Sequence, residues 1–292
     1  MRDAEKKAVS VRALRAEDLA FANAVRQLAG WNQTEHDWRG YLEYEPTGCF
    51  IADVDGKPAG TATTIRYADR FGWIGMVLVH PDQRRHGVGT TLLRHTIDYL
   101  QRAGVDSIKL DATPMGKHVY VPIGFVDEYE ISRYEGVAPV ATGGEAMREN
   151  VSALGAGDID AVARFDEPVF GAERARVIAS LRGRNPAWCF VARDGANVTG
   201  YLIARQGASA VQIGPWMARD AATAEDLWRA VSSRIAGKRV YIDVPAPNAP
   251  GVSLMQRLGF KVQRTLTRMF FGKNTSPGTP EKIYSTGGPE KG

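Results

Sequence analysis

Residues 76–93 read MVLVHPDQRRHGVGTTLL, and this stretch decides the fold prediction for the rest of the chain. It predicts an apolar strand, a turn opened by Pro81, a basic loop with two glycines, and a helix that begins at Thr90. Gly87 and Gly89 allow the backbone to approach a ligand closely. The free amides of the first helical turn lie at the positive end of the helix dipole, which favours phosphate. The stretch therefore predicts a phosphate-binding loop.

The glycine pattern of this loop becomes specific only in its context. A similar pattern occurs at residues 133–138, but Pro139 follows it and no helix is predicted there. The sequence 76–93 instead has a strand before the loop and an amphipathic helix after it. It lacks the Gly-Lys-Ser/Thr of a Walker loop and the Gly-x-Gly-x-x-Gly of a dinucleotide site. Its basic residues, Arg84, Arg85 and His86, make a diphosphate a better ligand than a single carboxylate.

The pattern Arg84-x-x-Gly87-x-Gly89 resembles the acyl-CoA loop of the GNAT acetyltransferase superfamily. A second motif follows at the distance typical of that family: a predicted strand over 108–112 and then Tyr120-Val-Pro-Ile-Gly-Phe. The resemblance implies an α/β fold with acetyl-CoA as co-substrate. It also implies that the chain transfers an acetyl group to an amine, by direct attack in a ternary complex.

The resemblance also implies roles for individual residues of the first half. It implies that the backbone at the end of the strand holds the pantetheine arm and the acetyl carbonyl, and that the loop holds the pyrophosphate. The residues expected to bind acetyl-CoA are Val77, Leu78, Val79, Arg84, Arg85, His86, Gly87, Val88, Gly89 and Thr90.

Tyr120 and Asp111 are the predicted catalytic residues. In the family, a tyrosine at the place of Tyr120 lies over the CoA sulfur. A phenol with a pKa of about 10 stays protonated at neutral pH and can donate to a departing thiolate with a pKa of about 8.5. The alternative for Tyr120 is a core aromatic near a helix end. Asp111 is expected to orient or deprotonate the amine, and a capping or turn carboxylate is an equally consistent alternative.

The second half of the chain repeats the first. Cys49-Phe50 recurs 140 residues later as Cys189-Phe190, and Gly124-Phe125 is echoed by Gly259-Phe260. The cysteines fall at the same strand position of each copy, which favours small buried hydrophobes over reactive thiols. We therefore predict two tandem GNAT-like domains, each a mixed, mostly antiparallel sheet flanked by helices.

The second copy lacks the features that would bind CoA. Residues 219–226, which correspond to the phosphate loop, contain three acids and no glycine, and such a surface repels diphosphate. Met255 stands where the first copy has Tyr120 and cannot donate a proton. The second copy resembles the degenerate C-terminal half of a bacterial tandem-GNAT group, in which that half faces a single CoA site.

These patterns divide the chain into three predicted parts. Residues 1–140 form the domain with the acetyl-CoA site, and residues 141–272 form the degenerate domain, with an acceptor-site or structural role. The linker is expected over 136–150, where Pro and Gly interrupt any apolar periodicity. Residues 273–292 are expected to be a disordered tail, because they contain too few apolar residues to bury.

The acceptor pocket is expected between the halves. The residues predicted to line it are Trp31, Asn32, Arg205 and Trp216. We expect the acceptor to be a small-molecule amine. A non-catalytic acyl-CoA sensor and an acetyltransferase acting on a protein amine are the alternatives.

The composition of the chain limits the classes of partner that we expect. Apolar residues make up 44% of the 292 residues, and no apolar run approaches the ~20 residues of a membrane span. The charged start MRDAEKK lacks the apolar core of a signal peptide, so we expect a cytoplasmic protein without a membrane partner. The net charge of +4 without a nucleic-acid motif indicates no nucleic-acid partner. No Cys/His cluster has metal-ligand spacing, so no metal is expected. Both a monomer and a homodimer are consistent with the sequence.

Overall fold

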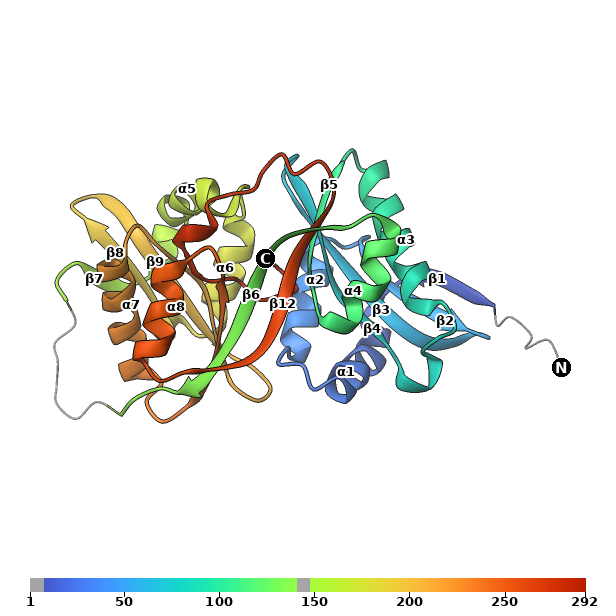
Figure 1. Ribbon diagram of the computed structural model, residues 1–292, viewed down its shortest axis with the longest axis horizontal. Coiled ribbons are helices and arrows are strands. Elements are labelled where there is room, and N and C mark those ends of the chain that lie inside the picture. The colour runs from blue at the N-terminus through green and yellow to red at the C-terminus, as the bar shows by residue number, and fades with distance from the viewer. Residues whose placement is uncertain (1–7, 141–147) are drawn as a thin grey trace.

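The computed structural model describes residues 8–140 and 148–292 and shows two similar lobes joined by two long strands (Figure 1). The first seven residues and the centre of the predicted linker, residues 141–147, lie outside the described residues. Within the described residues, no helix is both long enough and apolar enough to cross a membrane.

The two lobes follow the same order of elements, as the sequence repeat predicts. In the first half these are β1 (Val9–Ala13), α1 (Leu19–Leu28), α2 (Glu35–Tyr44), β2 (Cys49–Val54), β3 (Lys57–Tyr67), β4 (Phe71–Val79), α3 (Val88–Arg102), β5 (Ser107–Ala112), α4 (Pro114–Tyr120) and β6 (Val126–Val137). In the second they are β7 (Val151–Ala153), α5 (Ile159–Phe170), α6 (Ala175–Arg184), β8 (Cys189–Asp194), β9 (Asn197–Gln206), β10 (Val211–Ala218), α7 (Ala221–Arg234), β11 (Arg239–Pro245), α8 (Ala249–Arg257) and β12 (Lys261–Gly272). A short strand, β13 (Ile283–Ser285), follows.

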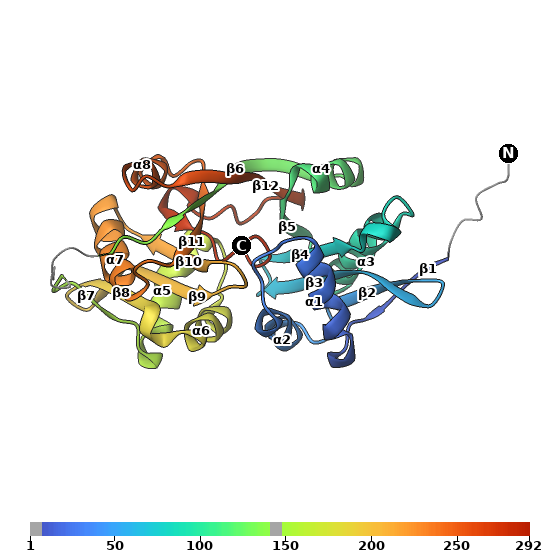
Figure 2. The ribbon, with the colours of Figure 1, turned by 90° about the horizontal axis from the view of Figure 1, so that it is seen from below.

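The two halves exchange their last strands and share one sheet. Its order is β1-β2-β3-β4-β5-β12-β6-β11-β10-β9-β8-β7, so β12 pairs with β5 of the first half and β6 pairs with β11 of the second. Figure 2 shows β6 and β12 side by side, bridging the lobes. In the part of the chain that the structure describes, only the β4–β5 and β10–β11 pairs are parallel. The predicted α/β fold with mixed, mostly antiparallel pairing is therefore confirmed, but the two sheets are continuous rather than separate.

The hydrophobic core is also shared between the halves. One buried cluster unites side chains of α1 and α2 with those of α5 and α6, including Trp38, Tyr41, Ile178 and Leu181. Both free cysteines lie buried in this cluster, as predicted from their matched strand positions. Separate clusters lie under α3 and α4 in one lobe and under α7 and α8 in the other. Because the central cluster spans both halves, their relative placement is set by packing.

The prediction that residues 273–292 are disordered is wrong. This segment returns between the lobes, where its end lies at the centre of the molecule (Figure 1). β13 pairs with β10, and the side chains of Glu290 and Lys291 are almost fully buried. The apolar content of the segment is low, but its order comes from polar groups that other parts of the chain satisfy. The predicted linker also begins too early, since β6 continues to Val137.

Ser285 gives a test of how firmly this segment is held. Its hydroxyl donates to the Ile213 carbonyl at 2.8 Å and accepts from the Asp243 amide at 2.9 Å. Replacing it (Ser285→Ala) leaves both buried backbone groups without that partner and should lower the free energy of unfolding by about 1–3 kcal/mol. Urea denaturation measures the change. The exposed Ser152→Ala is the control, and equal stability of the two variants would contradict the buried placement of the segment.

Candidate active site

The site is built on a bulge in β4. Met76 has a backbone φ of 50°, and the β3–β4 register shifts between Thr61 and Thr63 at this point. Beyond the parallel partners Trp73 and Lys109, β4 no longer pairs with β5. The two strands therefore diverge, and the end of β4 faces an open wedge with backbone groups that no neighbouring strand satisfies.

The glycine loop lies at the end of β4 and leads directly into α3. Gly87 has a φ of 79°, a left-handed conformation that favours glycine, and it caps the helix. The Thr91 amide makes the first helical hydrogen bond, to the Gly87 carbonyl at 2.9 Å. The helix thus begins at Val88, two residues before the predicted start, and the amides of its first turn remain free.

The basic residues of this loop face solvent. Arg84, Arg85 and His86 are exposed, and only Val88 of the loop–helix junction is buried. A side chain added at Gly89 would have only the Val79 methyl within 4 Å, at 3.6 Å. The junction therefore combines free amides, positive charge and open space, which are the properties of an anion site at a helix N-terminus.

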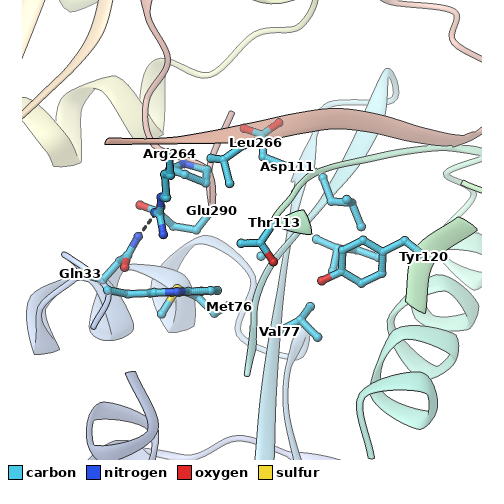
Figure 3. Close-up of a pocket in the computed structure, with 14 residues that line it drawn as sticks. Gln33, Met76, Val77, Asp111, Thr113, Tyr120, Arg264, Leu266 and Glu290 are labelled. Carbon is cyan, nitrogen blue, oxygen red and sulfur yellow. Dashed lines mark hydrogen bonds between the residues drawn. The ribbon is translucent and has the colours of Figure 1, made fainter. Parts of the chain in front are cut away.

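A pocket opens from the wedge toward the second half (Figure 3). Its volume is about 430 Å³, including the open mouth. The lining residues come from four parts of the chain: Ile74, Gly75, Met76 and Val77 of β4; Leu110, Asp111, Thr113 and Tyr120 around β5 and α4; Trp31 and Gln33 before α2; and Arg264, Leu266, Pro289 and Glu290 from β12 and the last segment. Both halves thus build its wall.

Tyr120 lies at one end of this pocket. Its ring is buried against Phe125, with centroids 6.0 Å apart, and its hydroxyl points into the pocket (Figure 3). Burial raises the pKa of the Tyr120 phenol to about 12. The group therefore stays protonated at neutral pH and is placed to donate a proton inside the pocket.

Asp111 lines the same pocket, but its carboxylate is already engaged. Both oxygens accept hydrogen bonds from the Arg268 guanidinium, at 2.9 and 3.0 Å, and the side chain is fully buried. Burial raises the pKa of the Asp111 carboxyl, and Arg268 opposes that rise. A carboxylate held on both oxygens is a poor proton acceptor, so the structure argues against the predicted role of base. Asp111 instead fixes β12 against β5.

The four predicted acceptor residues have different places in the structure. Trp31 lines the pocket beside Gln33. Asn32 instead ties the halves together, because its carboxamide bonds the backbone of Ser209 and Ala210. The prediction for Trp216 is wrong: its ring is fully buried in the second core, stacked on Trp228 with centroids 6.0 Å apart.

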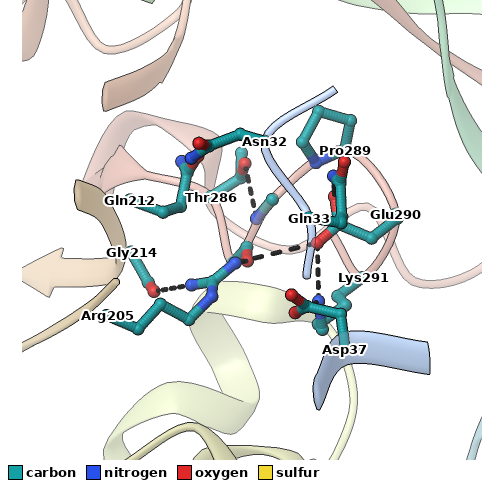
Figure 4. A network of polar contacts seen from close by, with 12 residues as sticks. Asn32, Gln33, Asp37, Arg205, Gln212, Gly214, Thr286, Pro289, Glu290 and Lys291 are labelled. Atoms are coloured by element: carbon teal, nitrogen blue, oxygen red, sulfur yellow. Dashed lines mark hydrogen bonds and ion pairs between the residues drawn. The ribbon is translucent and has the colours of Figure 1, made fainter. Parts of the chain in front are cut away.

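Arg205 holds the last segment of the chain (Figure 4). Its guanidinium donates to the carbonyls of Gly214 and Gly287, at 2.7 Å each, and lies 3.7 Å from the Glu290 carboxylate. It lines a smaller polar cavity behind the pocket. Arg205 therefore supports the pocket wall and does not line the pocket itself.

The last segment supplies wall residues that sequence analysis missed. The Pro289 carbonyl accepts from the Trp73 indole at 3.1 Å, and the Lys291 carbonyl accepts from the Tyr67 hydroxyl at 2.6 Å. Although burial opposes its ionisation, Lys291 and Arg205 hold the pKa of the Glu290 carboxyl below its usual range. No local pattern marks these residues, because each partner lies far away in the sequence.

The second half has a matching wedge, and the chain itself fills it. β10 pairs with β11 only from Val211 to Ile213, and β13 then pairs with β10. A side chain at Gly214 would collide with the Thr286 carbonyl oxygen. The Thr286 amide donates to the Asp243 carbonyl at 2.9 Å. This filling occupies the wedge beside Gly214, and the acidic residues of 219–226 stand where the first half has its glycine loop.

No group of His, Cys, Asp and Glu side chains in residues 8–140 and 148–292 has the geometry of a metal site.

Comparison with known proteins gives a family for each half. Residues 14–125 match the acetyltransferase (GNAT) family, and residues 162–285 match an acetyltransferase (GNAT) domain family. A holothin acyltransferase of Pseudoalteromonas sp. (strain SANK 73390) is 26% identical over 263 residues, which cover 90% of this chain and 87% of the relative.

Solved structures show the same fold. A putative acetyltransferase from Pyrococcus horikoshii has a TM-score of 0.82 at 23% identity, over 97% of this chain and 96% of that one. A tandem GNAT protein from the clavulanic acid biosynthesis pathway has a TM-score of 0.62 at 14% identity, over 91% of this chain and 98% of that one. The chain thus belongs to the GNAT acyltransferase superfamily, as a tandem protein with a GNAT domain in each half.

Proposed function

We propose that the chain is an N-acetyltransferase that transfers the acetyl group of acetyl-CoA to an amine of a small molecule. The observation that carries this proposal is the arrangement of three features around β4. The glycine loop follows the end of β4, the part of β4 that has left β5 lines the pocket between the halves, and Tyr120 lines the same pocket.

Two features of the first half support acetyl-CoA as the co-substrate. The free amides at the start of α3, with Arg84, Arg85 and His86, suit a pyrophosphate. The backbone from Val77 to Val79 pairs with β3 but not with β5, and its free side suits the amide groups of a pantetheine arm. In the described part of the second half, β13 pairs with β10 at the corresponding place. This supports a single acyl-CoA site for each chain.

Different groups of the pocket have different roles in the proposed reaction. The thioester of acetyl-CoA supplies an activated acyl group. The backbone amides of β4 are placed to donate to the carbonyl oxygen on which negative charge develops. Tyr120 donates its proton to the departing sulfur and regains one from water before the next turnover. Its raised pKa keeps the phenol protonated in the resting enzyme.

A dedicated base is not required by this arrangement. The two carboxylates that line the pocket, Asp111 and Glu290, are both engaged by cationic side chains. We propose that the amine enters in its neutral form and that water takes the proton released on attack. The rate should then rise with pH as the amine loses its proton.

The shape of the site favours a small acceptor over a protein. The pocket is walled on one side by β12 and by Pro289 and Glu290, and this enclosure supports a small acceptor. The relative named a holothin acyltransferase supports an acceptor of this kind. A sensor of acyl-CoA would need the loop but not a phenol directed into the pocket, and the Tyr120 hydroxyl therefore favours an enzyme.

The proposal is tested by release of CoA thiol from acetyl-CoA in the presence of a library of small amines. Gly89→Trp places a large side chain where the loop would meet the pyrophosphate, and turnover should fall below detection. Gly183→Trp is the matched control, since its Cβ also enters open space, on α6 of the second half. Thiol release that survives in Gly89→Trp would contradict the assigned site, and no release with any amine would contradict the activity.

Tyr120→Phe tests the proton donor. The variant keeps the buried ring and loses only the hydroxyl, so kcat should fall about 100-fold or more, within the usual range for acid–base catalysis, while the KM for acetyl-CoA changes little. Tyr134→Phe, a buried tyrosine of the second core, is the control. Unchanged kcat in Tyr120→Phe would show that another group protonates the thiolate.

The pH profile of the unmodified enzyme gives a separate test of the same assignment. Because the pKa of Tyr120 is raised to about 12, its acid form is lost only as the pH rises through that value. No decline of kcat should therefore appear up to about pH 10. A decline centred near the ordinary tyrosine pKa would contradict the burial argument.

A further inference from the structure

Arg264 is the cationic residue of the pocket wall that the proposed mechanism does not use. It lies on β12 just after a register shift between Val262 and Arg264. Figure 3 shows it with Gln33 and Glu290 at the end of the pocket opposite Tyr120. A group bound there would lie across the pocket from the reacting end.

Among the described residues, Arg264 lacks the carboxylate partner that four other arginines between the halves have. Those pairs are Arg133 with Asp243, Arg184 with Asp37, Arg205 with Glu290, and Arg268 with Asp111. In the described parts of the chain, the Nε of Arg264 is buried without a hydrogen-bond partner. No described carboxylate approaches its guanidinium to within ion-pair distance.

The surroundings make this unpaired charge unfavourable in the free protein. Arg264 lies directly across from Arg133 in the β12–β6 pair, and like charges at such positions repel. Burial lowers the pKa of the Arg264 guanidinium to about 10; Arg133 contributes to the lowering, and the carboxylates of Asp243 and Glu290 oppose it. The group is still charged at neutral pH.

Neither neighbouring carboxylate is free to pair with it. Asp243 receives two hydrogen bonds from Arg133, at 2.7 Å each. Glu290 accepts from Lys291 and from the Gln33 carboxamide, at 2.6 Å each. The remaining oxygen of Gln33 is itself buried without a partner in the described residues. Within the described residues, this end of the pocket therefore holds a guanidinium without a carboxylate partner, that of Arg264, and a hydrogen-bond acceptor without a donor, the Gln33 side-chain oxygen.

We propose that the acceptor carries a carboxylate in addition to its amine, and that Arg264 binds this carboxylate and so orients the amine toward β4 and Tyr120. This inference rests on the proposed function and narrows its substrate class to amino acids and similar zwitterions. A guanidinium suits the task because it can donate two parallel hydrogen bonds to a carboxylate. The same contact would exclude simple amines, which leave the charge unpaired.

The experiment compares the common L-amino acids with their α-amides as acceptors of acetyl-CoA. Each pair shares the amine and side chain and differs only in the carboxylate. For the accepted pairs, kcat/KM should favour the acid by about 10-fold or more, as expected for hydrogen bonds between a carboxylate and a partly buried guanidinium. Arg264→Gln should abolish the preference by raising the KM of the acid, with kcat less affected, and Arg264→Lys should restore part of it.

Two controls separate this role from a structural one. Arg70→Gln removes an exposed arginine and should leave the preference unchanged. Calorimetric titration of acetyl-CoA should give the same affinity in Arg264→Gln as in the unmodified protein, because the variant does not alter the loop or β4. Weakened acetyl-CoA binding in Arg264→Gln would overturn the assignment to the acceptor.

The source of the carboxylate is tested with succinyl-CoA, which carries one on the acyl group. If Arg264→Gln impairs transfer from succinyl-CoA to simple amines but not transfer from acetyl-CoA to amino acids, the inference is overturned. Equal rates for acids and amides, or acetylation of amines without any acid accepted, would also overturn it while leaving acyl transfer intact. Failure of acetyl-CoA to bind would instead reject the proposed function.

Discussion

The structure depends on how it satisfies the backbone groups that two diverging strand pairs leave open. β4 leaves β5 after Trp73, and β10 leaves β11 after Ile213. Buried N–H and C=O groups need partners, so a wedge of this kind must be filled by chain, ligand or water. In the second half the chain fills it with β13 and the Ser285 hydroxyl. In the first half the wedge opens into the pocket, and this is a clear structural difference between two otherwise similar folds.

One short segment near the end of the chain contacts both halves. Residues 283–286 close the second wedge, and Pro289 and Glu290 then wall the pocket of the first half. The exchanged strand β12 does the same from the other side, bringing Arg264 and Leu266 to the pocket and Arg268 to Asp111. Residues from the C-terminal half of the chain thus form part of the wall of a pocket that opens beside β4 of the first half.

The sequence predicts those parts of the structure that depend on local patterns. The loop with Gly87, the strand before it and the helix after it follow from residues close to one another, and the repeat follows from matched positions. The roles of other residues depend on distant partners. Asp111 looks like a free carboxylate until Arg268, 157 residues away, is placed against it. Glu290 and Lys291 look like a charged tail until Gln33, Asp37 and Arg205 surround them. Trp216 looks like a residue at the strand end, yet it stacks in the core.

The central claim is that each chain has one open wedge and one filled by its own residues. Calorimetric titration of acetyl-CoA into the protein tests it most directly. The measured stoichiometry gives the number of acetyl-CoA molecules bound per chain, and the measurement does not require a known acceptor. The account predicts one site for each chain. Two sites would show that β13 does not exclude the ligand from the second half. The absence of binding would show that the open end of β4 and the Gly87 loop do not form an acyl-CoA site.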